Sequence, residues 1–115
     1  MKKYSMAKPY LGVREKELVN EVLDSGILSI GPKIEEFEKK FAETLGVKYA
    51  CGVNSGTAGL HLAMLAAGVG EGDEVITSPF SFIASANSIL YVGGKPVFVD
   101  IEEKTNNIDP AKIEV

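Results

Sequence analysis

The sequence predicts an α/β fold with a mostly parallel sheet and flanking helices. Three short runs suited to strands, at residues 49–53, 74–77 and 96–101, are separated by two segments of helical character, at 58–67 and 81–92. Strands that alternate with helices form βαβ units, and such units place their strands parallel in one sheet with right-handed crossovers.

Two amphipathic helices are expected before the first strand. In residues 14–25 the apolar side chains recur at helical spacing, and Gly26 provides a C-terminal stop. The second helix begins at Pro32 and ends before Gly46. Its apolar stripe comprises Ile34, Phe37, Phe41 and Leu45.

The junction after the first predicted strand is the best candidate for a binding site. Residues 54–57, Asn-Ser-Gly-Thr, are good helix-capping residues, and the helix that follows is apolar on nearly every side, so we expect it to be largely buried. A helix N-terminus presents free N–H groups and a partial positive charge, which together suit a phosphate or a carboxylate. Gly56 leaves the backbone accessible, and Ser55 and Thr57 add hydroxyl donors. Simple helix capping explains the same residues, so residue types alone leave both interpretations open.

Composition limits the class of protein. The 115 residues suit one domain, and a net charge of −4 argues against a nucleic-acid partner, because basic residues gather only in short pairs such as Lys2-Lys3. The single cysteine excludes an internal disulfide and suits a reducing compartment. The sequence lacks a signal-peptide core and a membrane-length apolar stretch, so a cytoplasmic protein without membrane contact is expected.

The C-terminal residues suggest a longer protein. Asp109-Pro110 is typical of a helix start, because a proline lacks an N–H that the first turn does not use. Only five residues follow. A helix that begins and does not continue indicates a fragment, and a short terminal helix is the alternative.

Other chemistry-bearing residues favour structural roles. Residues 68–72, Gly-Val-Gly-Glu-Gly, follow a helix and precede a strand, the reverse of a dinucleotide-binding loop, so we interpret them as a connection. The only histidine, His61, is expected to pack as a neutral side chain and Cys51 to be a small core residue; no metal site is predicted. Phe80 and Phe82 follow a strand end, where an aromatic belongs either to the core or to the wall of a flat-ligand pocket.

Several segments carry a pattern that is specific in its order and spacing. They are residues 8–12 (KPYLG), 22–26 (VLDSG), Gly31 with Phe37-Glu38, 53–58 (VNSGTA), 72–76 (GDEVI), 78–84 (SPFSFIA) with Ala86-Asn87, and 96–101 (PVFVDI). Together they resemble the start of the DegT/DnrJ/StrS family of sugar aminotransferases, nearly end to end.

The resemblance implies the aspartate-aminotransferase-like large domain of fold type I, an α/β/α domain. Residues 1–115 would form its N-terminal segment, with the rest of that domain and a smaller C-terminal domain absent. It further implies a homodimer that uses pyridoxal 5′-phosphate (PLP). Members mostly transfer an amino group, usually from glutamate, to a keto-sugar nucleotide in polysaccharide or amino-sugar biosynthesis.

The resemblance also assigns site residues. The Gly56-Thr57 backbone, with Ser55 beside it, would hold the PLP phosphate, and Phe82 would stack on the pyridine ring. The segment that matches the sugar-nucleotide side of the pocket comprises Gly26, Ile27, Leu28 and Ser29.

The family's catalytic groups have no match in this sequence. Its Schiff-base lysine, and the aspartate that keeps the pyridine nitrogen protonated, lie downstream of residue 115, so no catalytic residue is predicted and the chain alone is expected to be inactive. Two alternatives stay open, namely a PLP-dependent sugar dehydratase of the same family and a non-catalytic remnant that binds a phosphate ligand or a partner protein. Uncovered apolar faces are also expected, with self-association or marginal stability as the consequence.

Overall fold

The computed structural model describes residues 7–113, and the basic pair Lys2-Lys3 lies outside them. The chain divides into two compact units, Met1–Gly52 and Val53–Val115. Each unit is described by itself.

The first unit contains two helices that match the prediction. Helix α1 spans Val13–Ser25 and ends at Gly26, whose φ of 69° is the left-handed conformation that glycine adopts without steric penalty. Helix α2 spans Pro32–Leu45 and ends at Gly46, with a φ of 67°. Both predicted stops are confirmed.

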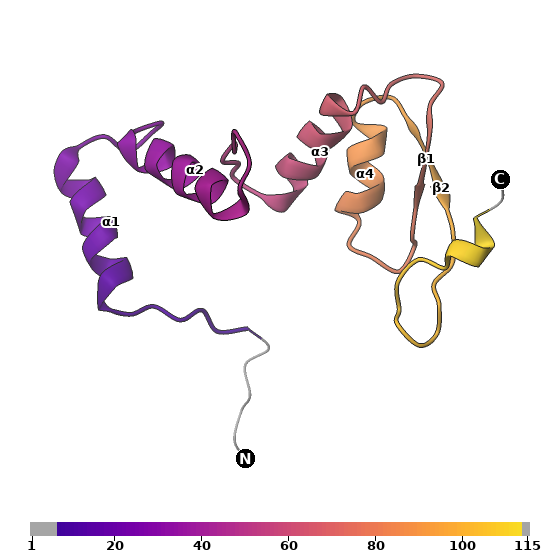
Figure 1. Ribbon diagram of the computed structural model, residues 1–115, viewed down its shortest axis with the longest axis horizontal. Coiled ribbons are helices and arrows are strands. Elements are labelled where there is room, and N and C mark those ends of the chain that lie inside the picture. The colour runs from indigo at the N-terminus through magenta and orange to yellow at the C-terminus, as the bar shows by residue number, and fades with distance from the viewer. Residues whose placement is uncertain (1–6, 114–115) are drawn as a thin grey trace, which may run out of the picture. The chain divides into compact units, whose positions relative to one another are not determined.

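The second unit is built around a parallel strand pair, as predicted. Strand β1 spans Glu74–Thr77 and strand β2 spans Lys95–Phe98, with Glu74 opposite Lys95 at one end and Thr77 opposite Phe98 at the other. Helices α3 (Gly56–Ala66) and α4 (Ala84–Leu90) complete it, with the short 3-10 helix η1 at Pro110–Lys112. Helix α4 packs against α3 and against both strands, and Figure 1 shows it beside the strand pair.

Most of the core in the described chain belongs to α4. Ile89 is only 2% exposed, and Ser88 is 1% exposed with its hydroxyl donating to the carbonyl of Ser85 at 3.1 Å. The other buried apolar residues of this unit are Ala84, Ala86 and Val99. Gly94 lets the chain pass close to this core, because a Cβ there would lie 2.9 Å from Val69 Cγ1 and 3.0 Å from Ile89 Cγ2.

The predicted strand at residues 49–53 is wrong for the described chain. These residues form no ladder with either strand, and the Gly52 N–H donates instead to Glu38 Oε1 at 2.7 Å. Cys51 is exposed, so its assignment to the core is also wrong. A strand needs a neighbouring strand to accept its backbone hydrogen bonds, and among the described residues no strand pairs with this segment.

Three further predictions need correction. Helix α3 was expected to be largely buried, but none of its residues is buried. It packs mainly on α4 among the described elements, and Leu62 and Leu65 stay about half exposed. Helix α4 begins three residues later than the predicted 81–92 segment and ends two earlier. The strand predicted at 96–101 ends at Phe98, and Ile101 forms only an isolated antiparallel bridge with Ile108.

The helix predicted at Asp109-Pro110 is a single 3-10 turn. Asp109 caps it as expected, since its carboxylate accepts from the Ala111 N–H at 3.0 Å. Across residues 7–113, no helix has both the length and the apolar character that a membrane span requires.

Candidate functional site

The candidate site lies at the N-terminus of α3. Ser55 is the N-cap in an extended conformation, and its Oγ accepts a hydrogen bond from the Ala58 N–H at 3.2 Å. The Gly59 N–H donates to the Ser55 carbonyl at 3.1 Å and so starts the regular helical pattern. The predicted capping turn is therefore confirmed.

Two amide groups remain available at this helix end. Within the described part of the chain, no group accepts a hydrogen bond from the N–H of Gly56 or of Thr57. Gly56 is exposed, and a Cβ built on it meets no atom within 4 Å, so solvent and ligands reach its backbone. Two free donors at the positive end of an eleven-residue helix are suited to an anion.

Gly56 and Thr57 also line a pocket of about 560 Å³. Helix α3 supplies one wall, and the loop after β1 with the first turn of α4 supplies the other. The lining residues are Gly56, Thr57, Gly59, Leu60, Phe82, Ala84 and Ser85. Phe82 is 74% exposed, so one face of its ring is open to a ligand. The pocket thus combines anion donors with an aromatic wall, the combination that a phosphorylated aromatic ring requires.

Three predicted cofactor residues lie around this pocket, and the fourth has a different position. Gly56, Thr57 and Phe82 line it, whereas Ser55 does not and its hydroxyl takes part in the cap. Sequence reasoning missed Ser85 as a lining residue. Its spacing of three residues from Phe82 places it one helical turn away, which is the signal that was available.

The residues predicted on the sugar-nucleotide side belong to the first unit. Ile27, Leu28 and Ser29 line a pocket of about 220 Å³ between the end of α1 and the start of α2. Gly26 forms the C-cap of α1 and is not among the lining residues. Ile30, also in the lining, has a φ of 30°, an uncommon backbone conformation for a β-branched residue.

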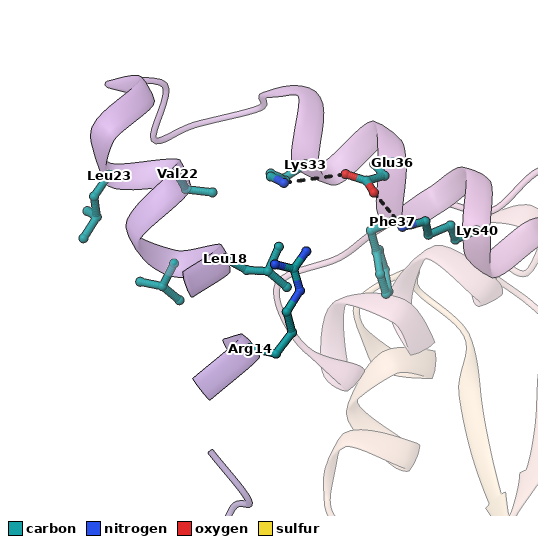
Figure 2. Close-up of a pocket in the computed structure, with 9 residues that line it drawn as sticks. Arg14, Leu18, Val22, Leu23, Lys33, Glu36, Phe37 and Lys40 are labelled. Carbon is teal, nitrogen blue, oxygen red and sulfur yellow. Dashed lines mark hydrogen bonds and ion pairs between the residues drawn. The ribbon is translucent and has the colours of Figure 1, made fainter. Parts of the chain in front are cut away.

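The first unit also carries a larger apolar pocket of about 550 Å³, drawn in Figure 2. Its apolar lining residues are Leu18, Val19, Val22, Leu23 and Phe37. The cations at its rim are paired: Lys33 lies 2.8 Å from Glu21, Lys40 lies 2.6 Å from Glu36, and Arg14 lies 3.3 Å from Glu17. A rim of satisfied ion pairs around an apolar floor suits packing against another apolar surface better than binding of a charged ligand.

Several other residues make contacts that fit structural roles. His61 is half-buried and lies edge-on to Tyr91, with ring centroids 5.4 Å apart, which favours packing. Residues 68–72 connect α3 to β1 as predicted, and the Gly70 N–H donates to Asp73 Oδ2 at 2.9 Å. The Asp100 carboxylate accepts from the Ile101 N–H at 2.8 Å and from Lys112 Nζ at 3.3 Å, and these contacts hold its pKa below the ordinary value.

Known proteins share both the sequence and the fold. The chain is 55% identical over 106 residues to the spore coat polysaccharide biosynthesis protein SpsC of Bacillus subtilis, covering 92% of this chain and 27% of SpsC. It is 50% identical over 111 residues to the GDP-perosamine synthase of Caulobacter vibrioides, covering 96% of this chain and 30% of that protein. The crystal structure of NtdA from Bacillus subtilis with bound cofactor PMP superposes with a TM-score of 0.79 at 41% identity, covering 85% of this chain and 22% of NtdA.

These comparisons confirm the fold class as part of an aminotransferase large domain. The chain spans less than a third of the length of each curated relative reported above. The DegT/DnrJ/EryC1/StrS aminotransferase family profile matches residues 9–115, so the match covers nearly the whole chain. The chain therefore belongs to the DegT/DnrJ/EryC1/StrS aminotransferase family.

Proposed function

We propose that this chain forms the phosphate-anchoring part of a PLP-dependent aminotransferase that acts on a keto-sugar nucleotide. The observation that carries the proposal is the pair of free amides at Gly56 and Thr57, residues that also line a pocket with an aromatic wall. When bound, PLP supplies the electron sink that amino transfer requires. NtdA, which has this fold, binds PMP, the amino form of the same cofactor.

Each residue of the pocket has a defined task in this proposal. The N–H groups of Gly56 and Thr57 donate to the phosphoryl oxygens, and the α3 dipole favours the negative charge at that point. Ser55 acts through the cap, because its bond to Ala58 keeps the first turn regular. Phe82 stacks on the flat ring and excludes water from that face.

The substrate and assembly parts of the proposal rest on the family. Named relatives make GDP-perosamine or contribute to spore coat polysaccharide, which supports a nucleotide-sugar acceptor; glutamate is the proposed amino donor. In this proposal Ile27, Leu28 and Ser29, with Gly26 shaping the turn, face the sugar nucleotide. A cytoplasmic homodimer completes it, and the exposed apolar side chains of α1 and α2 support an apolar partner surface.

Binding of PMP tests the anchoring role. PMP has an amine in place of an aldehyde, so it does not condense with surface lysines as PLP does. We expect the chain to bind PMP at least tenfold more tightly than pyridoxamine, which lacks the phosphate, because hydrogen bonds to charged groups contribute about 1.5–3 kcal/mol each. Fluorescence titration measures both affinities.

A substitution at the cradle gives the matched comparison. Gly56→Asp places a negative charge beside the amides and should remove the preference for PMP over pyridoxamine. Gly70→Asp adds the same charge in the α3–β1 connection, where a Cβ also meets no atom within 4 Å, and should leave PMP affinity unchanged. Equal affinity for PMP and pyridoxamine in the unaltered chain would contradict the anchoring role.

A chimera tests the activity. In the chimera, this chain replaces the matching 106 residues of SpsC. The chimera should transfer an amino group from glutamate to a keto-sugar nucleotide, and the chain alone should show no such activity. A chimera that binds PMP but transfers no amino group would retain phosphate anchoring and reject the aminotransferase assignment.

A further inference from the structure

Phe82 forms the aromatic wall of the pocket although its side chain is largely exposed. An exposed aromatic side chain has little packing to restrain it, so its orientation depends on how firmly the backbone on either side is held. Ser81 and Ser85 flank Phe82, and their Oγ atoms lie 3.0 Å apart, within hydrogen-bond distance. This hydrogen bond joins the two ends of the segment 81–85, which contains Phe82.

Main-chain hydrogen bonds attach the same turn to α4. The Ser85 N–H donates to the Phe82 carbonyl at 3.0 Å, and the buried Ser88 hydroxyl donates to the Ser85 carbonyl at 3.1 Å. Helix α4 contains most of the core residues of this unit, including Ile89. Phe82 is therefore connected through Ser85 to the best-packed element of the second unit.

We propose that the hydroxyl pair of Ser81 and Ser85 positions the Phe82 ring over the pocket lined by Gly56 and Thr57. The inference rests on the proposed function, in which this pocket holds a phosphorylated aromatic ring. Ser81 and Ser85 are then positioning residues that affect ligand affinity through Phe82. Direct contact between the Ser85 hydroxyl and the ligand is a different role, and the experiments below separate the two.

The first experiment needs no ligand. The chain has no tryptophan, so Phe82→Trp introduces a single fluorescent reporter at the pocket wall. Added to this variant, Ser81→Ala or Ser85→Ala should each lower the reporter's fluorescence anisotropy, because each removes the same hydrogen bond. Ser81→Thr and Ser85→Thr keep a hydroxyl and should preserve it.

A neighbouring aromatic supplies the control. Phe80 is 65% exposed, lies two residues away and does not line the pocket. A reporter at Phe80→Trp should keep its anisotropy when Ser81 or Ser85 becomes alanine. No change at position 82, or an equal change at both positions, overturns the inference.

The second experiment measures PMP affinity in the chain. Ser81→Ala and Ser85→Ala should each weaken PMP binding by roughly three- to tenfold and to the same extent, the loss expected for one hydrogen bond. Both effects should vanish in a Phe82→Leu background, because the effects of substitutions that act through the same side chain are not additive. Ser78→Ala is the matched control, since that hydroxyl accepts from the Phe80 N–H at 3.1 Å and should not affect binding.

The outcomes distinguish this inference from the proposed function. A loss confined to Ser85→Ala, or one that persists with Phe82→Leu, indicates direct ligand contact and overturns the positioning role. PMP binding that survives both alanine substitutions unchanged rejects this inference alone. Failure of the unaltered chain to bind PMP rejects the proposed function and this inference together. Circular dichroism checks that each variant is folded. If only one alanine variant folds, its effect with and without Phe82→Leu still separates positioning from direct contact.

Discussion

In the second unit, α4 buries Ala84, Ala86 and Ile89 against its neighbours, whereas in the first unit α1 buries no residue and α2 buries only Ala42. Both units carry apolar side chains on their helices, but the surfaces that cover these helices differ. A strand pair offers α4 a broad surface, while α1 and α2 leave an apolar pocket open between charged side chains. The amphipathic pattern thus predicts which face of a helix is apolar. Whether that face is buried depends on whether another element packs against it.

The largest expected effect is in the core of the second unit. Ile89→Ala should lower the free energy of unfolding by about 3 kcal/mol, because a buried isoleucine loses its contacts and leaves a cavity. Its neighbour Leu90 is 55% exposed, and Leu90→Ala should change the same quantity by less than about 1 kcal/mol. Urea unfolding measures both, and equal effects would remove the proposed contrast between buried and open helix faces.

Gly94 tests how tightly this core is packed. Gly94→Ala should destabilise the second unit by about 1–3 kcal/mol, since its new Cβ would lie 2.9 Å from Val69 Cγ1 and 3.3 Å from the Ile89 carbonyl oxygen. Gly70→Ala is the control, because a Cβ there meets no atom within 4 Å. Urea unfolding of the two variants should differ, and a neutral Gly94→Ala would show a loosely packed core.

In the first unit, local backbone conformation should matter more than packing. Gly26→Ala should destabilise the end of α1 by about 1 kcal/mol, because alanine at a φ of 69° is strained although no atom lies within 4 Å of its Cβ. Gly26→Asn should lose less, since asparagine tolerates this conformation. Amide hydrogen exchange of α1 measures the effect, and equal losses for alanine and asparagine would contradict this explanation.

The ion pair between α1 and α2 should have the smallest effect. Lys33 donates a hydrogen bond to Glu21 and holds the Glu21 pKa below its ordinary value, while Glu21 raises the pKa of Lys33. The Glu21 contribution is therefore present above pH 4.5 and lost as the pH falls through the lowered pKa. The Lys33 contribution is present below pH 10.5 and lost as the pH rises through the raised pKa.

Replacing the lysine tests this assignment. Lys33→Met should return the Glu21 pKa toward its ordinary value in an NMR titration, with little change in stability because both side chains are exposed. Lys39 forms no ion pair with any described residue. Lys39→Met therefore removes a charge without breaking a pair and should leave the Glu21 titration unchanged. An unchanged Glu21 titration in Lys33→Met would show that the pair does not form in solution.

Local signals predicted the elements of the chain well. The glycines at 26 and 46 end α1 and α2, Ser55 caps α3, and β1 has the predicted bounds. Each signal is a property of a few neighbouring residues, such as a glycine with positive φ or a hydroxyl within reach of an N–H. The free amides at Gly56 and Thr57 were predictable for the same reason, because helix capping is local.

The errors arose where a feature depends on a distant partner. Residues 49–53 have strand-like composition, yet no strand within residues 7–113 pairs with them, and Glu38 accepts a hydrogen bond from the Gly52 N–H instead. The apolar sequence of α3 suggested burial, but its exposure depends on what covers it. Ser85 was missed because only the packing of α4 beside α3 places it in the lining of the pocket.

The sequence by itself determined where α1 and α2 end, the cap of α3, and the free amides at the start of α3. Those features follow from backbone sterics and from hydrogen bonds between residues close along the chain. Only the tertiary structure decided which apolar faces are buried and which side chains join Gly56 and Thr57 around one pocket. Burial and pocket lining depend on surfaces brought together from distant parts of the chain, and no short stretch of sequence contains both sides of such a contact.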